Sequence, residues 1–252
     1  MLAIFKREFK SYFTSPLGYI VLAAYYFFLG YYFVYMFQNG SPYIHAIITA
    51  MSTIVLITSP AITMRLFSEE RRQKTDQILL TSPVKLSSVV MGKFLAAFSV
   101  HAIGFVPTVI FQIIVSSYVS VSIFTYLYSL VGIMLFGAAL IAIGMFVSSL
   151  TESPVISIFV TLVINIAFLF VNTITSQITI PTVAEDSSWF QKFIVVPVVK
   201  GLVSLLNSLD IRSVLESFNE QILSFTDIIY FVSIIAAFLF LSVRALDKRR
   251  WS

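Results

Sequence analysis

The sequence predicts an all-α polytopic membrane protein made of one transmembrane domain, residues 1–252. The chain is 58% hydrophobic and only 11% charged, with a mean hydropathy of +0.95, whereas soluble domains carry about 25% charged residues. Its apolar residues gather in runs long enough to cross a bilayer, which takes about 20 residues. There is no cysteine, so disulfide bonds and thiol chemistry are excluded.

Six apolar runs meet this length and predict six transmembrane helices. When the last run is counted from Ile228, none of the six contains Asp, Glu, Lys or Arg, and His45 and His101 are their only histidines. No internal repeat or second domain is evident. The predicted spans are about 17–37, 42–64, 94–119, 124–148, 155–175 and 226–243.

The basic residues predict how these spans are oriented. In a six-span arrangement, 16 Lys and Arg residues are distributed so that all but Lys192, Lys200 and Arg212 lie in the N-terminus, the loop 65–93 or the C-terminal tail. Cytoplasmic loops carry the excess of Lys and Arg in membrane proteins. We therefore expect both termini and this loop in the cytoplasm. The net charge of +4 indicates orientation, and no nucleic-acid partner is expected.

The segment between spans five and six contains a shorter apolar run, residues 193–206. It is interrupted by Pro197, Lys200 and Gly201, and a seventh span would move the basic C-terminus to the outside. We therefore predict a re-entrant or interfacial segment. The residues after it, 211–223, have apolar side chains at helical spacing, which predicts an amphipathic helix on the outer surface or packed on the re-entrant piece.

The first residues predict an interfacial helix ahead of span one. One face carries Leu2, Phe5, Phe9, Tyr12 and Phe13, and the other carries most of Lys6, Arg7 and Lys10. Such a helix lies on the inner leaflet, where its cations meet the anionic lipid of the bilayer. Ser15 and Pro16 then begin the first span, because proline is tolerated in the first turn of a helix.

Motifs for catalysis, phosphate binding and metal binding are missing from the sequence. Around Gly92-Lys93, Ser87 and Phe94 occupy positions that a phosphate-binding loop would fill with Gly and Ser or Thr. Two histidines in different spans make a poor metal site, and an ion-coupled carrier usually keeps charged residues inside its spans. We therefore expect no catalytic residue, metal or cofactor on this chain, and an energy source on another chain.

The loop 65–93 is charged and locally organised. Ser68 is expected to cap a short helix with Glu69 and Glu70 in its first turn, where the helix dipole favours acids. Thr75 is expected to cap a second short helix, with Asp76 behind it. Two short helices with an exposed apolar edge are typical of a docking surface, although the edge could instead rest on the bilayer. That edge consists of Ile78, Leu79 and Leu80.

The stretch RLFSEERRQKTDQILLTSPVKLSSVVMGKFLAA resembles the signature region of ABC-2 type transporter permeases. The commoner Gly-Thr-Leu-Glu of that region is Lys74-Thr75-Asp76-Gln77 here, which weakens any role for an acid at position 77. The first and last segments of the chain also resemble the gliding-motility-type permease subgroup, so the resemblance covers essentially the whole sequence. The matching residues are Glu69, Glu70, Arg71, Thr75, Leu79, Leu80, Ser82, Pro83, Val84, Gly92 and Lys93.

This resemblance implies the permease subunit of an ABC transporter in a bacterial plasma membrane. The loop between spans two and three would carry a coupling helix that docks on a separate cytoplasmic ATPase, which binds ATP and Mg²⁺. A second permease is implied, as a homodimer or heterodimer, and the subgroup suggests an auxiliary membrane protein with a large extracytoplasmic domain. The implied coupling residues are Glu69, Glu70, Arg71, Arg72, Thr75, Asp76, Leu79, Leu80 and Pro83.

Polar side chains form one stripe in span two and one in span five, the spans that line the path between paired permeases of this family. They are candidates for a substrate path or a dimer face, while ordinary helix packing is the alternative. A path without charge favours an amphipathic, lipid-like, peptide or glycan cargo. The stripes are Thr49, Ser52, Thr53, Ser59 and Thr63 in span two, and Ser157, Thr161, Asn165, Phe168 and Asn172 in span five.

These observations favour three classes of function to different degrees. An ABC-2 permease, acting as an exporter with a separate ATPase, agrees with the motif and the spans. A self-powered carrier or channel is disfavoured because the apolar runs hold no charged residue. An intramembrane enzyme is disfavoured because no catalytic set is present.

Overall fold

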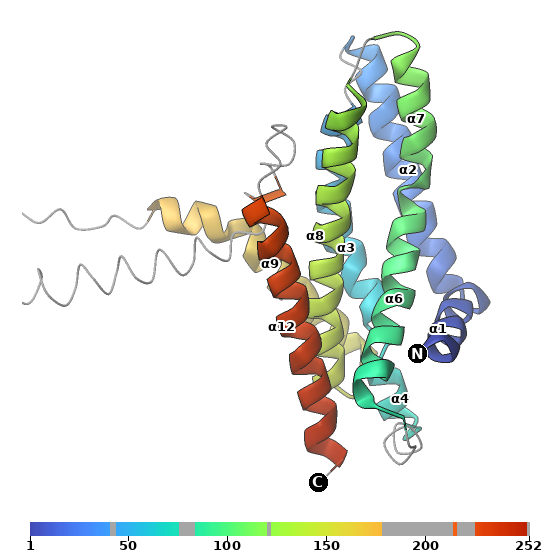
Figure 1. Cartoon of the computed structure of the whole chain (residues 1–252), viewed down its shortest axis with the longest axis vertical. Coiled ribbons are helices and arrows are strands. Elements are labelled where there is room, and N and C mark those ends of the chain that lie inside the picture. Colours follow the sequence, from blue (N-terminus) through green and yellow to red (C-terminus); the bar gives the residue numbers. More distant parts are fainter. Residues whose placement is uncertain (41–43, 76–83, 120–121, 178–213, 216–224, 251–252) are drawn as a thin grey trace, which may run out of the picture.

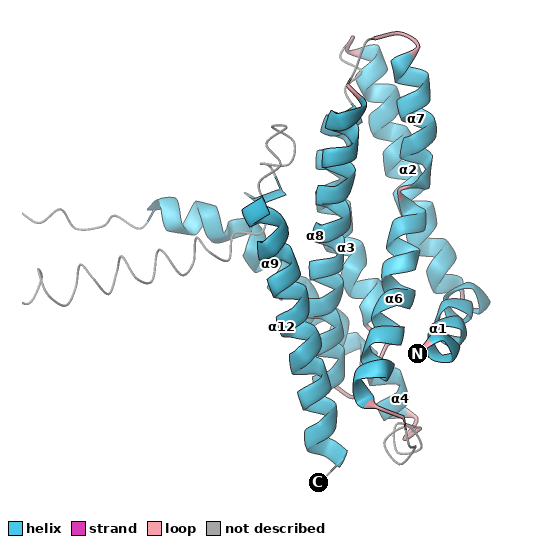
Figure 2. Ribbon diagram, in the orientation of Figure 1, coloured by secondary structure: helices cyan, strands magenta, loops and turns pink. Residues whose placement is uncertain are grey.

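The computed structural model describes residues 1–40, 44–75, 84–119, 122–177, 214–215 and 225–250, with backbone alone for residues 169 and 172–177. Each regular element in these residues is a helix (Figures 1 and 2). The helices are α1 (Leu2–Thr14), α2 (Pro16–Gln38), α3 (Ile44–Thr63), α4 (Ser68–Arg72), α6 (Leu86–Gly104), α7 (Val106–Ser116), α8 (Ile123–Leu150), α9 (Pro154–Gln177) and α12 (Phe225–Arg250).

Five helical stretches in the described residues are long and apolar enough to cross a membrane. The helix α9, predicted as span five, has a shorter apolar stretch, Pro154–Phe168. The all-α membrane fold is therefore confirmed, whereas a sixth span stays a prediction. The predicted segment 193–206, and nearly all of 211–223, lie outside the described residues. The five stretches are Pro16–Gln38, Ile44–Arg72, Leu86–Ser116, Ile123–Leu150 and Phe225–Arg250.

The third and last helical stretches differ from their predicted bounds. Helix α6 begins at Leu86, ahead of the predicted start at 94, and the stretch divides at Phe105, after which α7 carries Pro107 in its first turn. Proline lacks an N–H and fits the start of a helix better than its interior, which explains this break. Helix α12 continues to Arg250, so the basic tail extends the last helix.

Helix α8 forms the centre of the bundle and packs against α3, α6, α9 and α12 (Figure 1). Its residues from Phe136 to Met145 are all buried, and they include Gly137 and Gly144. Small residues let membrane helices approach closely. In Figure 1 both chain termini and α4 lie towards the lower end of this bundle.

His101 joins four helices through hydrogen bonds in the middle of the bundle. Its Nδ1 lies 3.0 Å from the hydroxyl of Tyr25 on α2, and its Nε2 lies 3.3 Å from the carbonyl oxygen of Ile133 on α8. Thr58 on α3 donates to the same Tyr25 hydroxyl at 3.0 Å. A Cβ at Gly137 would overlap the imidazole, so the glycine provides its space. His101 is thus a hydrogen-bonded packing residue.

Candidate functional site

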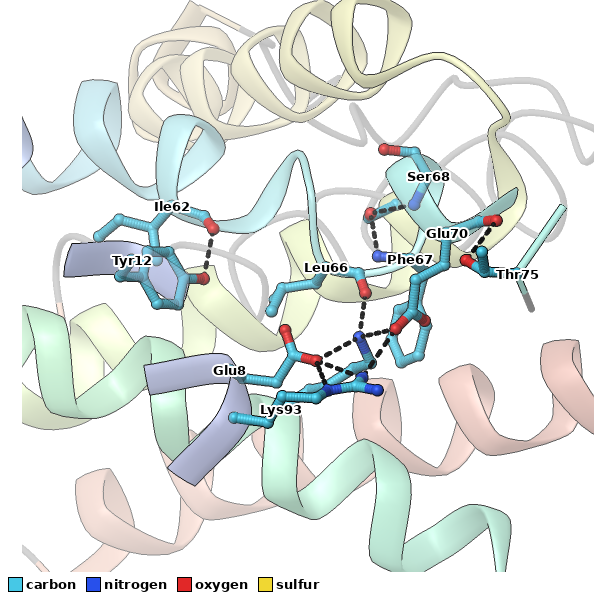
Figure 3. A network of polar contacts seen from close by, with 11 residues as sticks. Glu8, Tyr12, Ile62, Leu66, Phe67, Ser68, Glu70, Thr75 and Lys93 are labelled. Carbon is cyan, nitrogen blue, oxygen red and sulfur yellow. Dashed lines mark hydrogen bonds and ion pairs between the residues drawn. The ribbon is translucent and has the colours of Figure 1, made fainter. Parts of the chain in front are cut away.

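The junction between α3 and α4 is held by side chains from distant segments. The end of a helix leaves carbonyl groups without backbone partners. Tyr12 on α1 donates its hydroxyl to the carbonyl of Ile62 at 2.7 Å, and Lys93 on α6 donates to the carbonyl of Leu66 at 2.6 Å (Figure 3). The junction therefore contacts the N-terminal helix and α6 through specific bonds to its backbone.

Ser148 on α8 provides the cap at the start of α4. Its Oγ accepts hydrogen bonds from the backbone N–H groups of Phe67 and Ser68, at 3.1 and 3.2 Å. Ser68 is already the first residue of α4, and its own hydroxyl donates to the carbonyl of Met64. The prediction that Ser68 caps this helix was wrong, because the hydroxyl bonds back to the preceding turn. Glu69 and Glu70 do lie in the first turn.

Lys93 is the buried centre of an ionic cluster. Its side chain is only 1% exposed, and its Nζ lies 2.9 Å from Glu70 Oε1 and 3.2 Å from Glu8 Oε1 (Figure 3). With the Leu66 carbonyl, the ammonium has three acceptors for its three hydrogens. A buried charge is tolerated when it is paired and hydrogen-bonded in this way.

Arg7 closes the cluster on its exposed side. Its Nη2 lies 2.6 Å from Glu8 Oε1 and 3.0 Å from Glu70 Oε1. The hydrogen bond to Glu8 raises the pKa of Arg7, and burial raises the pKa of the Tyr12 hydroxyl, so both remain donors. We call Arg7, Glu8, Glu70 and Lys93 the charged clamp. It joins α1, α4 and α6.

Gly92, next to Lys93, lets α1 lie against α6. A Cβ at this position would come within 3.2 Å of the Ile4 Cβ and the Met1 carbonyl oxygen, tighter than ordinary contact. The Gly92-Lys93 pair of the signature region therefore has two physical roles in this chain. The glycine brings α1 close, and the lysine binds the acids of α1 and α4.

A cavity of about 440 Å³ opens between α1 and the α3–α4 segment. Its charged lining is balanced, with Arg7, Arg65 and Lys93 opposed by Glu8, Glu69 and Glu70. Each of these six groups takes part in an ion pair. The cavity is lined by Arg7, Glu8, Ser11, Tyr12, Ser15, Leu17, Arg65, Leu66, Glu69, Glu70, Gln73, Thr75 and Lys93.

The other implied coupling residues divide between bonded and exposed positions. Arg71 donates to the carbonyl of Leu150 at 2.8 Å and to Glu152 at 2.6 Å, which joins α4 to the α8–α9 connection. Arg72 is exposed, and the backbone N–H and hydroxyl of Thr75 both donate to the carbonyl of Glu70. The remaining implied coupling residues, Asp76, Leu79, Leu80 and Pro83, lie outside the described residues, and so does most of the predicted second helix.

The polar stripe predicted in span two is buried unevenly. Ser52, Ser59 and Thr63 are buried, Thr49 is half-buried and Thr53 is exposed. Thr49 and Thr63 donate their hydroxyls to the carbonyl groups of His45 and Ser59, one turn earlier in the same helix. Because Ser59 and Thr63 are almost fully buried, this end of the stripe faces other helices.

The stripe predicted in span five meets α3 inside the subunit. Ser157, Thr161 and Asn165 are fully buried, and Phe168 is half-buried. The Asn165 amide nitrogen donates to the Leu56 carbonyl and to the Ser59 hydroxyl, at 3.0 Å each. Asn172 is one of the residues for which the structure describes the backbone alone. We call the buried polar residues shared by α3 and α9 the polar seam, which consists of Ser59, Thr63, Ser157, Thr161 and Asn165.

Comparison with known proteins identifies the family. A family model described as ABC-2 family transporter protein matches residues 32–251. No curated protein matches the chain. Within the described residues, no group of three or more His, Cys, Asp or Glu side chains is placed to hold a metal ion. Because the family match spans most of its length, the chain belongs to the ABC-2 family of membrane transport components.

Proposed function

We propose that this chain is the permease subunit of an ABC exporter, driven by a separate ATPase that docks on the loop 65–93. Members of the family generally work with a cytoplasmic ATPase and often dimerise. The observation that carries the proposal is the charged clamp. A docking loop transmits movement only if its ends are firmly attached, and the buried Lys93 attaches α4 to two other helices.

Movement of the docking loop would reach the bundle by two routes. The first is the charged clamp, through which Glu70 acts on α1 and α6. The second is Arg71, which contacts Leu150 and Glu152 between α8 and α9. Because α8 is central and α9 packs on α3, displacement of α4 changes the packing of the helices that hold both polar stripes.

The expected partners follow from the family and the motif. ATP and Mg²⁺ bind on the ATPase, and a second permease completes the path. The resemblance of the first and last segments supports the gliding-motility-type subgroup, with its auxiliary membrane protein, in a bacterial plasma membrane. The distribution of Lys and Arg supports a cytoplasmic position of both termini. The uncharged spans support an amphipathic, lipid, peptide or glycan cargo. We place the coupling contact at Leu79 and Leu80 and the path at the polar stripes.

Co-purification tests the docking. The double variant Leu79→Asp, Leu80→Asp should insert normally but release the ATPase from affinity-purified complexes, because two charges replace the apolar edge. Gln73→Asp, an exposed position in the same loop, adds a charge outside that edge and should leave the complex intact. Recovery of the ATPase at wild-type yield with the double variant would show that docking occurs elsewhere.

A further inference from the structure

Among the described side chains of α9, three fully buried polar atoms have no hydrogen-bond partner. They are the Oγ of Ser157, the Oγ1 of Thr161 and the Oδ1 of Asn165. The residues are four positions apart, so they share one face of the helix. Most buried polar atoms in proteins are paired, and an unpaired one loses its bonds to water without replacement. Burial of this face of α9 against α3 therefore costs free energy, and we call this buried arrangement the closed seam.

The opposite wall of the seam contains a break in the hydrogen bonds of α3. Pro60 lies inside this helix and has no N–H, so the carbonyl of Leu56, four residues earlier, loses its helical donor. The Asn165 amide nitrogen replaces that donor at 3.0 Å and also donates to Ser59. One amide thus ties α9 to α3 through its nitrogen, while its oxygen stays unpaired.

The closed seam is also tightly packed at the level of Thr161. A Cβ on Gly144 of α8 would overlap the Thr63 Oγ1 and come within 3.1 Å of the Thr161 Cγ2. There is no room for a methyl group beside Gly144, and a bound water needs comparable space together with polar partners. The Thr161 hydroxyl itself is fully buried, so the closed seam separates it from water.

We infer that α9 separates from α3 along the polar seam, and that the seam then becomes a water-accessible crevice within one subunit. Separation gives Ser157, Thr161 and the Asn165 oxygen hydrogen bonds with water, at the cost of the Asn165 tie to α3. The outer face of α9 exposes Phe159, Val163 and other apolar residues, so the polar atoms can reach water only on the seam side. The inference rests on the proposed function, since a transport component has to open a polar route.

Thiol labelling of the permease alone tests the opening. The chain has no cysteine, so Thr161→Cys places a single thiol in the seam. Ser129→Cys is the matched control, because Ser129 is equally buried and its hydroxyl is bonded to the Thr125 carbonyl. Ser129 and Gly144, which adjoins Thr161, lie at similar distances from opposite ends of α8, so their depths in the membrane are comparable.

We expect a small maleimide to label Thr161→Cys at least about tenfold faster than Ser129→Cys in lipid nanodiscs, an opening difference of about 1.4 kcal/mol. Equal rates would overturn the inference, because the seam would then open no more often than the core. Both proteins are measured without an ATPase. Failure of docking, which would overturn the proposed function, therefore leaves this result unaffected.

Melting temperatures provide the second measurement. Thr161→Val removes an unpaired hydroxyl with little change of shape and should raise the Tm by about 2–4 °C. Thr63→Val is its control in the same seam, because this hydroxyl donates to the Ser59 carbonyl, and the variant should lower the Tm. A fall with Thr161→Val would mean that the hydroxyl has a partner in the closed state, and the inference would be wrong.

Discussion

The charged clamp and the polar seam both bury polar groups, but only the clamp satisfies them. In the clamp, the ammonium of Lys93 has three acceptors from three segments of the chain. In the seam, Ser157, Thr161 and the Asn165 oxygen have none. Buried polar networks stabilise a fold when every group is paired and weaken it when some are not. The comparison predicts a firm attachment at the docking loop and a weak contact between α3 and α9.

Removal of the clamp's buried charge should have the largest effect. Lys93→Met leaves Glu8 and Glu70 without their buried cation, with only the exposed Arg7 as a partner, and the loss of one member of a buried ionic set costs up to about 3–5 kcal/mol. Thermal unfolding of the purified permease measures the change. Lys10→Met removes an exposed lysine from α1 and should change the Tm little. If both variants melt alike, the clamp is solvated and the comparison fails.

The same site offers a rescue that separates lost charge from lost packing. In Lys93→Met only the more exposed Arg7 still pairs with Glu8 and Glu70, and adding Glu8→Gln and Glu70→Gln removes both of these carboxylates. Replacing buried charges together by neutral groups is often tolerated, and the remaining Arg7 is 58% exposed, so the triple variant should recover much of the lost Tm. The rate of ATP hydrolysis by the partner ATPase in complex with the triple variant should stay low, because the ionic attachment of α4 is gone. Full activity would show that transmission does not pass through the clamp.

A methyl group added to the seam should have the next largest effect. Gly144→Ala forces Thr63 and Thr161 apart, and overpacking of this kind costs about 1–3 kcal/mol. It should also accelerate labelling of Thr161→Cys, because the seam is pushed open. At Gly30 a Cβ would meet nothing within 4 Å, so Gly30→Ala should be neutral or slightly stabilising. Equal stability of the two variants would show that the seam has room for the added methyl group.

Loss of the Asn165 tie should have a smaller effect. Asn165→Leu removes two hydrogen bonds and leaves the Leu56 carbonyl with only the long bond from the Ser59 hydroxyl, at 3.4 Å, but it also removes the unpaired Asn165 oxygen. We expect a loss of about 1–2 kcal/mol in unfolding free energy. Pro60→Ala supplies the missing backbone donor, so it should restore much of the stability in the double variant. Additive losses would mean that the amide does not replace the helical bond.

Sequence patterns predicted the elements better than the contacts between them. Hydrophobic length placed the helices, whereas the pairing of Arg65 with Glu69 was not predicted, although the two residues are four positions apart. The clamp was missed, because nothing local connects Glu8 with Glu70 or Lys93. Ser68 was misassigned as a cap, since the competing Ser148 lies in another helix.

The seam was predicted in part. The spacing of Ser157, Thr161 and Asn165 identified one polar face, and the structure places that face against α3. The partner of Asn165 was missed, although Pro60 was a usable signal. An internal proline indicates an unpaired carbonyl four residues earlier. Which helix supplies its donor depends on tertiary packing, which a single sequence does not contain.

The smallest effect should come from an ion pair at the edge of the clamp. Arg65 and Glu69 are bonded at 2.6 and 2.9 Å, but their side chains are 38% and 33% exposed. Exposed pairs at this spacing contribute only about 0.3–0.5 kcal/mol and weaken in salt. Arg65→Gln should therefore lower the Tm slightly at low NaCl and less at high NaCl, whereas the loss caused by Lys93→Met should persist at high NaCl. Arg72→Gln, exposed on α4, controls for a change in net charge. If Arg65→Gln destabilises as strongly as Lys93→Met, burial is not what distinguishes the clamp, and the firm attachment extends to the exposed charges of the loop.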